Sequence, residues 1–431
     1  MSNFRMILTA VFAMFIVVGV IMFSIYRGGV GGGETGERIT VWGVIPESVF
    51  AKYIESVNSN KDARISVNYV EKEDDSFDKE FIEALAKGAG PDAILLPQDK
   101  ILRHKDKIYL IPYGSLSERA FKDAFIEESE LYLSSEGIIA LPLSIDPLVM
   151  YWNRDIFTDA LLPQPPAYWD EFFSLVSKIT EVDSSLNIGR SAVSFGEFTN
   201  ISNAKEIISL LILQAGNPIV KIDNDRPITV LKDKIGFAIP PSEAALRFYT
   251  EFSNPSKKSY SWNRSLPLSR QYFLSGDLAV YFGFASEFSD IKMKNPNLNF
   301  DAAVVPQRRE AKKKTTFGRI QGLALVKSSR KLSPAFNTIS TLANKDNISL
   351  WSKASGLPPV RRDLLALGAA DPVVSTFYTS AIISKGWLDP DREETETIFK
   401  NMVESIVSGK SRLGEAVSRA DSEIQNLLSK E

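Results

Sequence analysis

Residues 39–96 read ITVWGVIPESVFAKYIESVNSNKDARISVNYVEKEDDSFDKEFIEALAKGAGPDAILL and indicate the fold. The runs 39–42 and 65–69 are rich in β-branched residues and 92–96 is a short apolar run, which is typical of buried strands. Two intervening segments repeat apolar side chains at helical spacing: Phe50, Tyr53, Ile54 and Val57 in the first, and Phe81, Ile82, Leu85 and Ala86 in the second. The order strand, helix, strand, helix, strand predicts a parallel sheet covered by helices.

The rest of the chain continues this alternation and contains more helix. Apolar stripes at helical spacing recur in three later segments: Trp169, Phe172, Phe173, Val176 and Ile179; Ala245, Phe248, Tyr249 and Phe252; Phe399, Met402, Val403 and Ile406. No internal repeat of solenoid length is present in the sequence. The expected fold class is therefore α/β.

Length and composition are those of a globular protein with more than one folding unit. A chain of 431 residues predicts two or three such units. Its content of 44% hydrophobic and 24% charged residues argues against extensive disorder. The formal net charge of -3 gives no support to nucleic-acid binding, because phosphate recognition needs concentrated positive charge.

Two residue types that carry much enzyme chemistry are absent or rare. The chain has no cysteine and one histidine, His104, so disulfides, thiolate sites and multi-histidine metal sites are excluded. His104 lies in the charged run 103–107, RHKDK, where we expect an exposed side chain rather than a sheltered catalytic base. We therefore expect no enzyme, no catalytic residue, no metal and no cofactor. A glycosidase with paired carboxylates stays open as the less favoured alternative.

The N-terminus predicts a membrane anchor. Residues 6–26 carry no charge, and a helix of that length rises roughly 31 Å, which matches the hydrocarbon thickness of a bilayer. We expect a retained transmembrane anchor at 1–27, with a cleaved signal peptide as the alternative. A glycine-rich tether follows at 28–37. The predicted location is the cell membrane, with the folded part on the extracytoplasmic side.

Seven short stretches stand in a fixed order along the chain. They are 39–43 (ITVWG), 90–94 (GPDAI), 137–153 (GIIALPLSIDPLVMYWN), 165–172 (PPAYWDEF), 273–279 (FLSGDLA), 356–359 (GLPP) and 408–416 (SGKSRLGEA). In this order they resemble the motifs of the family 1 extracellular solute-binding proteins, the maltose-binding-protein-like group. Each motif is weak alone, but chance matches would not keep both order and spacing.

The resemblance implies a periplasmic-binding-protein-like (type II) fold with a ligand cleft between two α/β lobes. It places the first lobe at 38–145 and 300–344, and the second at 146–299 and 345–431. It also implies a monomer that closes by hinge rotation on a small polar solute, which we expect to be a carbohydrate. The protein would then deliver this solute to the permease subunits of an ABC importer. A ligand sensor or envelope binding module without a transporter is the alternative.

Sugars present hydroxyls together with apolar ring faces, so a site for them needs aromatic side chains as well as carboxylates or amides. Trp42, at the end of the first strand, is the main aromatic candidate, with a core position as the competing interpretation. Asp99 and Lys100 follow the third strand, where ligands of open α/β sheets sit. Asp146, in an apolar segment, is expected at the cleft. The remaining candidates lie in the second lobe: Trp262, Phe284 and Trp387.

Overall fold

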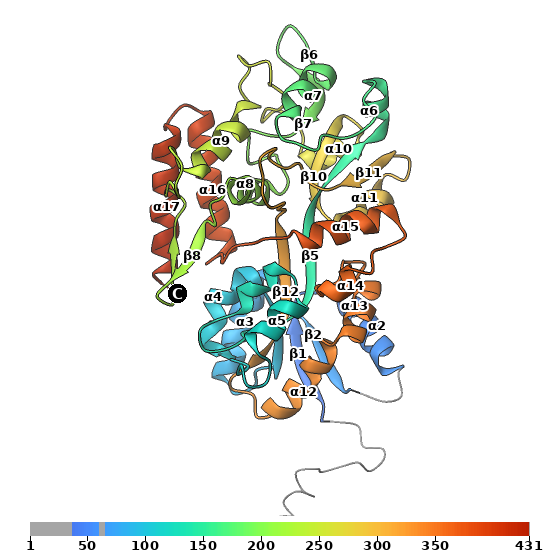
Figure 1. Cartoon of the computed structure of the whole chain (residues 1–431), viewed down its shortest axis with the longest axis vertical. Helices are drawn as coiled ribbons and strands as arrows, with labels where there is room; N and C mark the ends of the chain where they lie inside the picture. The colour runs from blue at the N-terminus through green and yellow to red at the C-terminus, as the bar shows by residue number, and fades with distance from the viewer. Residues whose placement is uncertain (1–36, 60–64, 431) are drawn as a thin grey trace, which may run out of the picture.

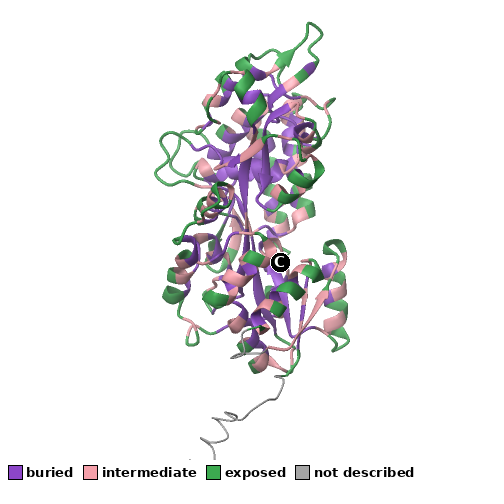
Figure 2. Cartoon of the chain, turned by 90° about the vertical axis from the view of Figure 1, so that its right-hand side faces the viewer, coloured by how far each residue is buried: buried purple, intermediate pink, exposed green. Residues whose placement is uncertain are grey.

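The computed structural model describes residues 37–59 and 65–430. Two lobes are stacked along the longest axis of the molecule, and strand β5 (Leu141–Asn153) runs from one lobe into the other (Figure 1). Each lobe contains its own cluster of buried apolar side chains, and Figure 2 shows these buried segments along the centre of both lobes. The predicted two-lobed α/β architecture is confirmed.

The first lobe combines the N-terminal elements with a later segment. Its elements are β1 (Ile39–Gly43), α2 (Glu47–Asn58), β2 (Val67–Glu71), α3 (Asp74–Ala86), β3 (Ala93–Pro97), α4 (Ile101–His104), β4 (Ile108–Tyr109), α5 (Glu118–Ala124), β12 (Gly318–Val326), α12 (Leu332–Leu342), α13 (Lys345–Ser355) and α14 (Arg362–Leu365). Strand β1 pairs in parallel with both β2 and β3, which confirms the parallel arrangement predicted for residues 39–96. Helix α2 buries Phe50, Tyr53 and Val57, three of its four predicted core residues.

The second lobe contains most of the remaining helices. Its elements are α6 (Arg154–Asp159), α7 (Glu171–Ile179), β6 (Glu181–Val182), β7 (Ile188–Val193), α8 (Ala204–Gln214), β8 (Val220–Asp223), β9 (Arg226–Thr229), α9 (Pro241–Glu251), α10 (Ser269–Leu274), β10 (Leu278–Phe284), α11 (Glu287–Lys294), β11 (Phe300–Ala303), α16 (Arg392–Val407) and α17 (Leu413–Leu428). Helix α15 (Pro372–Ile382) lies where the lobes meet, since Phe377 packs in the second core and Ala381 in the first.

One sheet passes through both lobes, in the order β2-β1-β3-β12-β5-β10-β7-β6. The first half of β5 pairs antiparallel with β12, where Asp146 lies opposite Arg319. Its second half pairs antiparallel with β10, where Leu148 lies opposite Phe284. Strands β5 and β12 therefore form the crossing between the lobes, next to Pro147.

The two cores divide the chain differently from the predicted lobe boundaries. Strand β11 pairs with the second half of β5, so residues 300–305 extend the second lobe, and the chain returns to the first lobe at β12. Helices α13 and α14 contribute Ile348, Trp351, Leu364 and Leu365 to the first core. The pairing of β5 decides the boundary, and this pairing is not visible in local sequence.

The prediction that His104 is exposed is wrong. Its ring is fully buried between Phe77 and Phe81, and its Nε2 lies 2.8 Å from the Asp78 Oδ1. The short helix α4 turns this one side chain inward, while Arg103 and Lys105 of the same charged run keep contact with solvent.

Across residues 37–59 and 65–430, no helix is long and apolar enough to span a bilayer. The anchor predicted at 1–27, and the predicted tether except its last residue, lie outside the described residues.

Candidate functional site

A cavity of about 80 Å³ lies between the two lobes. The first lobe contributes Val44, Asp74, Pro97, Gln98 and Asp99; the segment at the crossing contributes Phe317, Arg319, Ile320 and Gln321; the second lobe contributes Lys205, Glu206, Trp387, Asp389 and Arg392. This space holds only a few water molecules. A solute of sugar size therefore enters only when the lobes move apart.

The lining side chains are placed by the ends of strands and helices. Asp99 lies on a 3-10 turn (Gln98–Lys100) directly after β3, at the carboxyl end of that strand. Lys205 and Glu206 occupy the first turn of α8, and Arg392 is the first residue of α16. Trp387 and Asp389 belong to the loop between α15 and α16. Strand ends of one lobe thus face helix starts of the other, an arrangement that suits polar recognition.

Ion pairs connect the charged side chains around this cavity. The Lys205 Nζ lies 2.6 Å from the Asp389 Oδ2, and both side chains are almost fully buried. Arg319, on the crossing strand β12, pairs with Glu206 of the second lobe. The Arg392 Nη1 lies 3.8 Å from the Asp74 Oδ2 of the first lobe. The second and third of these pairs therefore join side chains that belong to different lobes.

Burial and neighbouring charges alter the titration of the carboxyl groups at the site. Burial raises the pKa of the Asp99 carboxyl, and the nearby Asp389 raises it further. Burial alone would raise the pKa of Glu206, but the charges of Arg319 and Lys205 lower it to about 2. Glu206 is consequently a stable anion at neutral pH, whereas the ionised form of Asp99 is disfavoured by its surroundings.

Two aromatic side chains, Phe317 and Trp387, line the cavity, and the larger of them is Trp387. Its ring is stacked on Phe399 with a centroid distance of 6.2 Å, and only 2% of the residue is exposed. The Lys205 Nζ lies 5.8 Å from the centre of the same ring. Packing against Phe399 holds the indole in one orientation at the cavity wall.

Two of the predicted binding residues, Asp99 and Trp387, line this cavity. Lys100 does not line it, and its Nζ contacts the Asp74 Oδ1 at 3.0 Å and the Asp78 Oδ1 at 3.4 Å. The Trp42 ring packs instead under the Lys72 Nζ, at 4.1 Å, outside the lining.

The other three candidates lie beside the cavity or in the core. The Asp146 Oδ1 accepts a hydrogen bond of 3.0 Å from the Ser286 N–H, and burial raises the pKa of Asp146 to about 6. The Phe284 ring is covered by the Arg319 guanidinium at 3.8 Å. Trp262 has no exposed surface and donates to the Asn200 Oδ1 at 3.1 Å inside the second lobe. Ligand contacts by these residues stay predictions, and the position of Trp262 does not support one.

The sequence interpretation missed six charged residues of the lining: Asp74, Lys205, Glu206, Arg319, Asp389 and Arg392. A signal for two of them exists. Lys205 and Glu206 open the segment AKEIISLLILQ, whose later residues are almost all apolar, and charges at the start of a fully buried helix call for partners. Arg319 gives no comparable signal, because its role follows from the pairing of β12 with β5.

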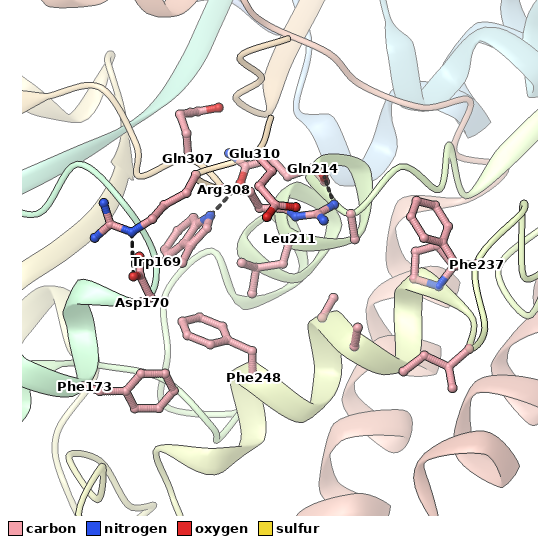
Figure 3. A pocket seen from close by; sticks show the side chains of 16 residues that line it. Trp169, Asp170, Phe173, Leu211, Gln214, Phe237, Phe248, Gln307, Arg308 and Glu310 are labelled. Atoms are coloured by element: carbon pink, nitrogen blue, oxygen red, sulfur yellow. Dashed lines mark hydrogen bonds and ion pairs between the residues drawn. The ribbon is translucent and has the colours of Figure 1, made fainter. Parts of the chain in front are cut away.

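Two other hollows lie elsewhere. An apolar pocket of about 490 Å³ is enclosed by α7, α8, α9 and residues 307–310, with the Trp169 Nε1 donating to the Gln214 Oε1 at 2.5 Å (Figure 3). A wider polar groove of about 1190 Å³ lies between the α4–β4 segment and the β8–β9 hairpin with the end of α17. Neither is lined by any of the seven predicted binding residues, and the apolar pocket lies away from the lobe interface.

Comparisons with known proteins agree with this architecture. Residues 52–376 match the sequence model of the bacterial extracellular solute-binding proteins. Putative binding proteins of Brucella abortus (strain 2308) and Brucella suis biovar 1 (strain 1330) are each 22% identical over 331 residues, which cover 72% of this chain and 74% of the relative.

Solved structures show the same fold. A cyclo/maltodextrin-binding protein complexed with maltotetraose has a TM-score of 0.72 and 16% identity, covering 92% of this chain and 98% of its own. The sugar-binding protein MalE from Xanthomonas citri has a TM-score of 0.71 and 18% identity, covering 91% and 98%. A solute-binding protein from Thermotoga lettingae, bound to α-D-tagatose, has a TM-score of 0.63 and 20% identity, covering 91% and 100%.

Proposed function

The chain belongs to the bacterial extracellular solute-binding protein family, and we propose that it captures a carbohydrate-like solute between its two lobes. The observation that carries this proposal is the composition of the interlobe cavity. Carboxylates, cationic side chains and one indole line it, and they come from both lobes. Such a mixture can bind hydroxyls and an apolar ring face at once.

The two-lobed architecture explains how capture would be controlled. A solute shifts the balance between open and closed forms only if it binds the closed form better, and contacts from both lobes provide this difference. The lobes are connected by the neighbouring strands β5 and β12 and by the segment that runs through α15 to α16, and rotation about such connections is typical of hinge closure. The small cavity volume fits a cycle in which the lobes open before each binding event.

The class of solute is supported by the relatives. Structures with this fold are described as complexes with maltotetraose and with α-D-tagatose, so a carbohydrate is the first class to test here. Sequence identities of 16% and 20% do not transfer individual ligand contacts, and the lining residues of this chain are therefore argued from their own chemistry.

Anchoring and delivery complete the proposal. The uncharged residues 6–26 would hold the chain at the membrane, next to the permease subunits of an ABC importer. The alternative, a ligand sensor without a transporter, uses the same cavity. An uptake experiment distinguishes the importer from the sensor. Transport of the bound solute into vesicles that contain the permease subunits supports the importer.

Binding is tested by thermal shift and calorimetry on the full-length chain with a panel of mono- and oligosaccharides. A solute at 100 times its dissociation constant stabilises the folded state by about 2.7 kcal/mol, which raises the midpoint of unfolding. Trp387→Phe, which keeps an aromatic ring, is expected to weaken binding about threefold to tenfold. Asp75→Asn, on the exposed side of α3, is the control and should bind normally. Absence of binding across the panel contradicts the proposal.

A further inference from the structure

The three cationic side chains that line the interlobe cavity are already paired with carboxylates. Lys205 contacts Asp389 at 2.6 Å, Arg392 contacts Asp74 at 3.8 Å, and Arg319 pairs with Glu206. Lys205 also donates to the Thr395 Oγ1 at 2.7 Å. The charges of Lys205 and Arg319 are thus balanced inside the protein, whereas Arg392 shares Asp74 with Lys100.

Asp99 is the fourth carboxylate of the lining, and none of these cations pairs with it. Its Oδ1 is buried and has no hydrogen-bond partner among the described residues. A buried carboxylate oxygen without a partner is costly, because it has lost its hydration without gaining a hydrogen bond. Asp99 therefore leaves a buried carboxyl oxygen without a partner at the wall of the cavity.

Three further buried side-chain oxygens in this region have no hydrogen-bond partner among the described residues. They are the Oε1 of Gln321, which lines the cavity, and both carboxylate oxygens of Glu128. Glu128 lies close to the lining residue Gln98, since both side chains approach the same point beside Gly386. A Cβ placed on Gly386 would lie 2.6 Å from the Gln98 Nε2 and 2.7 Å from the Glu128 Oε1. Each of these oxygen atoms can accept a hydrogen bond. Among the described residues, no buried donor nitrogen of the cavity lining lacks a hydrogen-bond partner.

From this imbalance we propose that the solute carries a protonated amine in addition to its hydroxyls, as an amino sugar does, and that Asp99 is the main partner of that amine. The inference rests on the proposed function, since it names the class of carbohydrate that the same cavity takes. An ammonium group has three donors and no acceptor, which fits a lining with spare buried acceptors. Hydrogen bonds between two charged groups are also stronger than those between neutral ones.

The electrostatics of Asp99 support the geometry. Burial raises the pKa of its carboxyl, Asp389 and Asp74 raise it further, and Arg392 and Lys205 lower it without offsetting burial. A cation that enters beside Asp99 favours the ionised carboxylate and removes part of this cost. A neutral hydroxyl would donate one hydrogen bond to Asp99 but would favour the ionised carboxylate less than a cation does.

The test compares matched sugars that differ at one substituent. For each sugar that binds the full-length chain, calorimetry measures the neutral parent, its 2-amino analogue and the N-acetylated form of that analogue, at a pH where the amine is protonated. The amino form is expected to bind at least about tenfold more tightly than the other two, since a charged hydrogen-bonded pair is gained only there. Asp99→Asn keeps the size of the side chain and should remove this preference, whereas Asp75→Asn should retain it.

The outcomes separate the two proposals. If neutral and amino sugars bind with equal affinity, or if the preference survives in Asp99→Asn, the amine proposal is overturned while the proposed function stands. If the N-acetylated form binds as tightly as the amine, the shape of the substituent and not its charge determines the affinity, and the amine proposal is again overturned. If no carbohydrate binds, the proposed function itself falls. The unfolding midpoint of each variant without solute shows that the variants are folded.

Discussion

Arg103 of the first lobe forms an ion pair with Asp391 of the second lobe, across the gap beside the cavity. Arg103 also pairs with Asp78 on α3, which in turn contacts His104 and Lys100. Asp391 is the N-cap of α16, and its Oδ1 accepts hydrogen bonds from the N–H groups of Glu393 and Glu394. One carboxylate thus starts a helix and joins the lobes at the same time.

Removing the charge of Asp391 should favour the open form. In Asp391→Asn the side chain still caps α16, because asparagine is an equally good N-cap, but the ion pair with Arg103 is lost. A partly exposed pair contributes about 0.2–1 kcal/mol, so the affinity for solute should fall roughly twofold to fivefold. Small-angle scattering without solute should show a larger radius of gyration than in the wild type. An unchanged radius and affinity would show that the pair has no role in closure.

Gly386 should be required for closure, because it stands where the two lobes touch. A Cβ at this position would lie 2.6 Å from the Gln98 Nε2 of the first lobe, which is closer than real side chains approach. Gly386→Ala is therefore expected to weaken solute binding at least about tenfold while the second lobe stays folded. Calorimetry measures the affinity, and circular dichroism checks the fold. The control is Gly189→Ala, because a Cβ at Gly189 meets no atom within 4 Å. Gly88→Ala is unsuitable, because Gly88 has a positive φ that alanine adopts only with strain.

Asp146 should make stability depend on pH between about 4 and 6. Burial raises its pKa from 3.8 to about 6, although Ser286 and Arg319 oppose this and Glu287 adds to it. In this range the folded state binds more protons at Asp146 than the unfolded state does, so its contribution to stability falls as pH rises.

Asp146→Asn should flatten that part of the profile and stabilise the protein at neutral pH. Urea unfolding of both proteins across the range measures the difference between the profiles. Since only the difference is interpreted, other titrating groups cancel. A wild-type and a variant profile that run parallel would contradict the raised pKa.

Lys205 and Asp389 should be strongly coupled. Their side chains are 4% and 6% exposed, so removing one partner leaves the other as a buried charge. Lys205→Met or Asp389→Leu alone is expected to cost about 3–5 kcal/mol of unfolding free energy, and the double variant less than the sum of the two. Chemical denaturation of the four proteins forms the cycle. Additive losses would mean that the pair is not coupled.

Local patterns were sufficient for the parts of this fold that depend on neighbours in sequence. The strand–helix alternation of residues 39–96 predicted the parallel pairing of β1 with β2 and β3. The position of Asp99 after β3 also predicted a place at the ligand edge of the sheet, and it lines the cavity. By contrast, the exposure of His104 was mispredicted, because one inward turn of a charged segment leaves no periodic signal.

The sequence by itself determined the α/β class, because the period of apolar residues selects strands and helices and the order of these selects the class. The two-lobed architecture was implied by the family resemblance of seven short motifs. The sequence also placed Asp99 and Trp387 near the site. Only the tertiary structure decided that Arg319, Lys205 and Arg392 are paired with carboxylates while Asp99 is not. All four of these ion pairs, including that of Arg103 with Asp391, connect residues more than 100 positions apart. Distance along the chain therefore carries no information about which charges meet once strands from two lobes share one sheet.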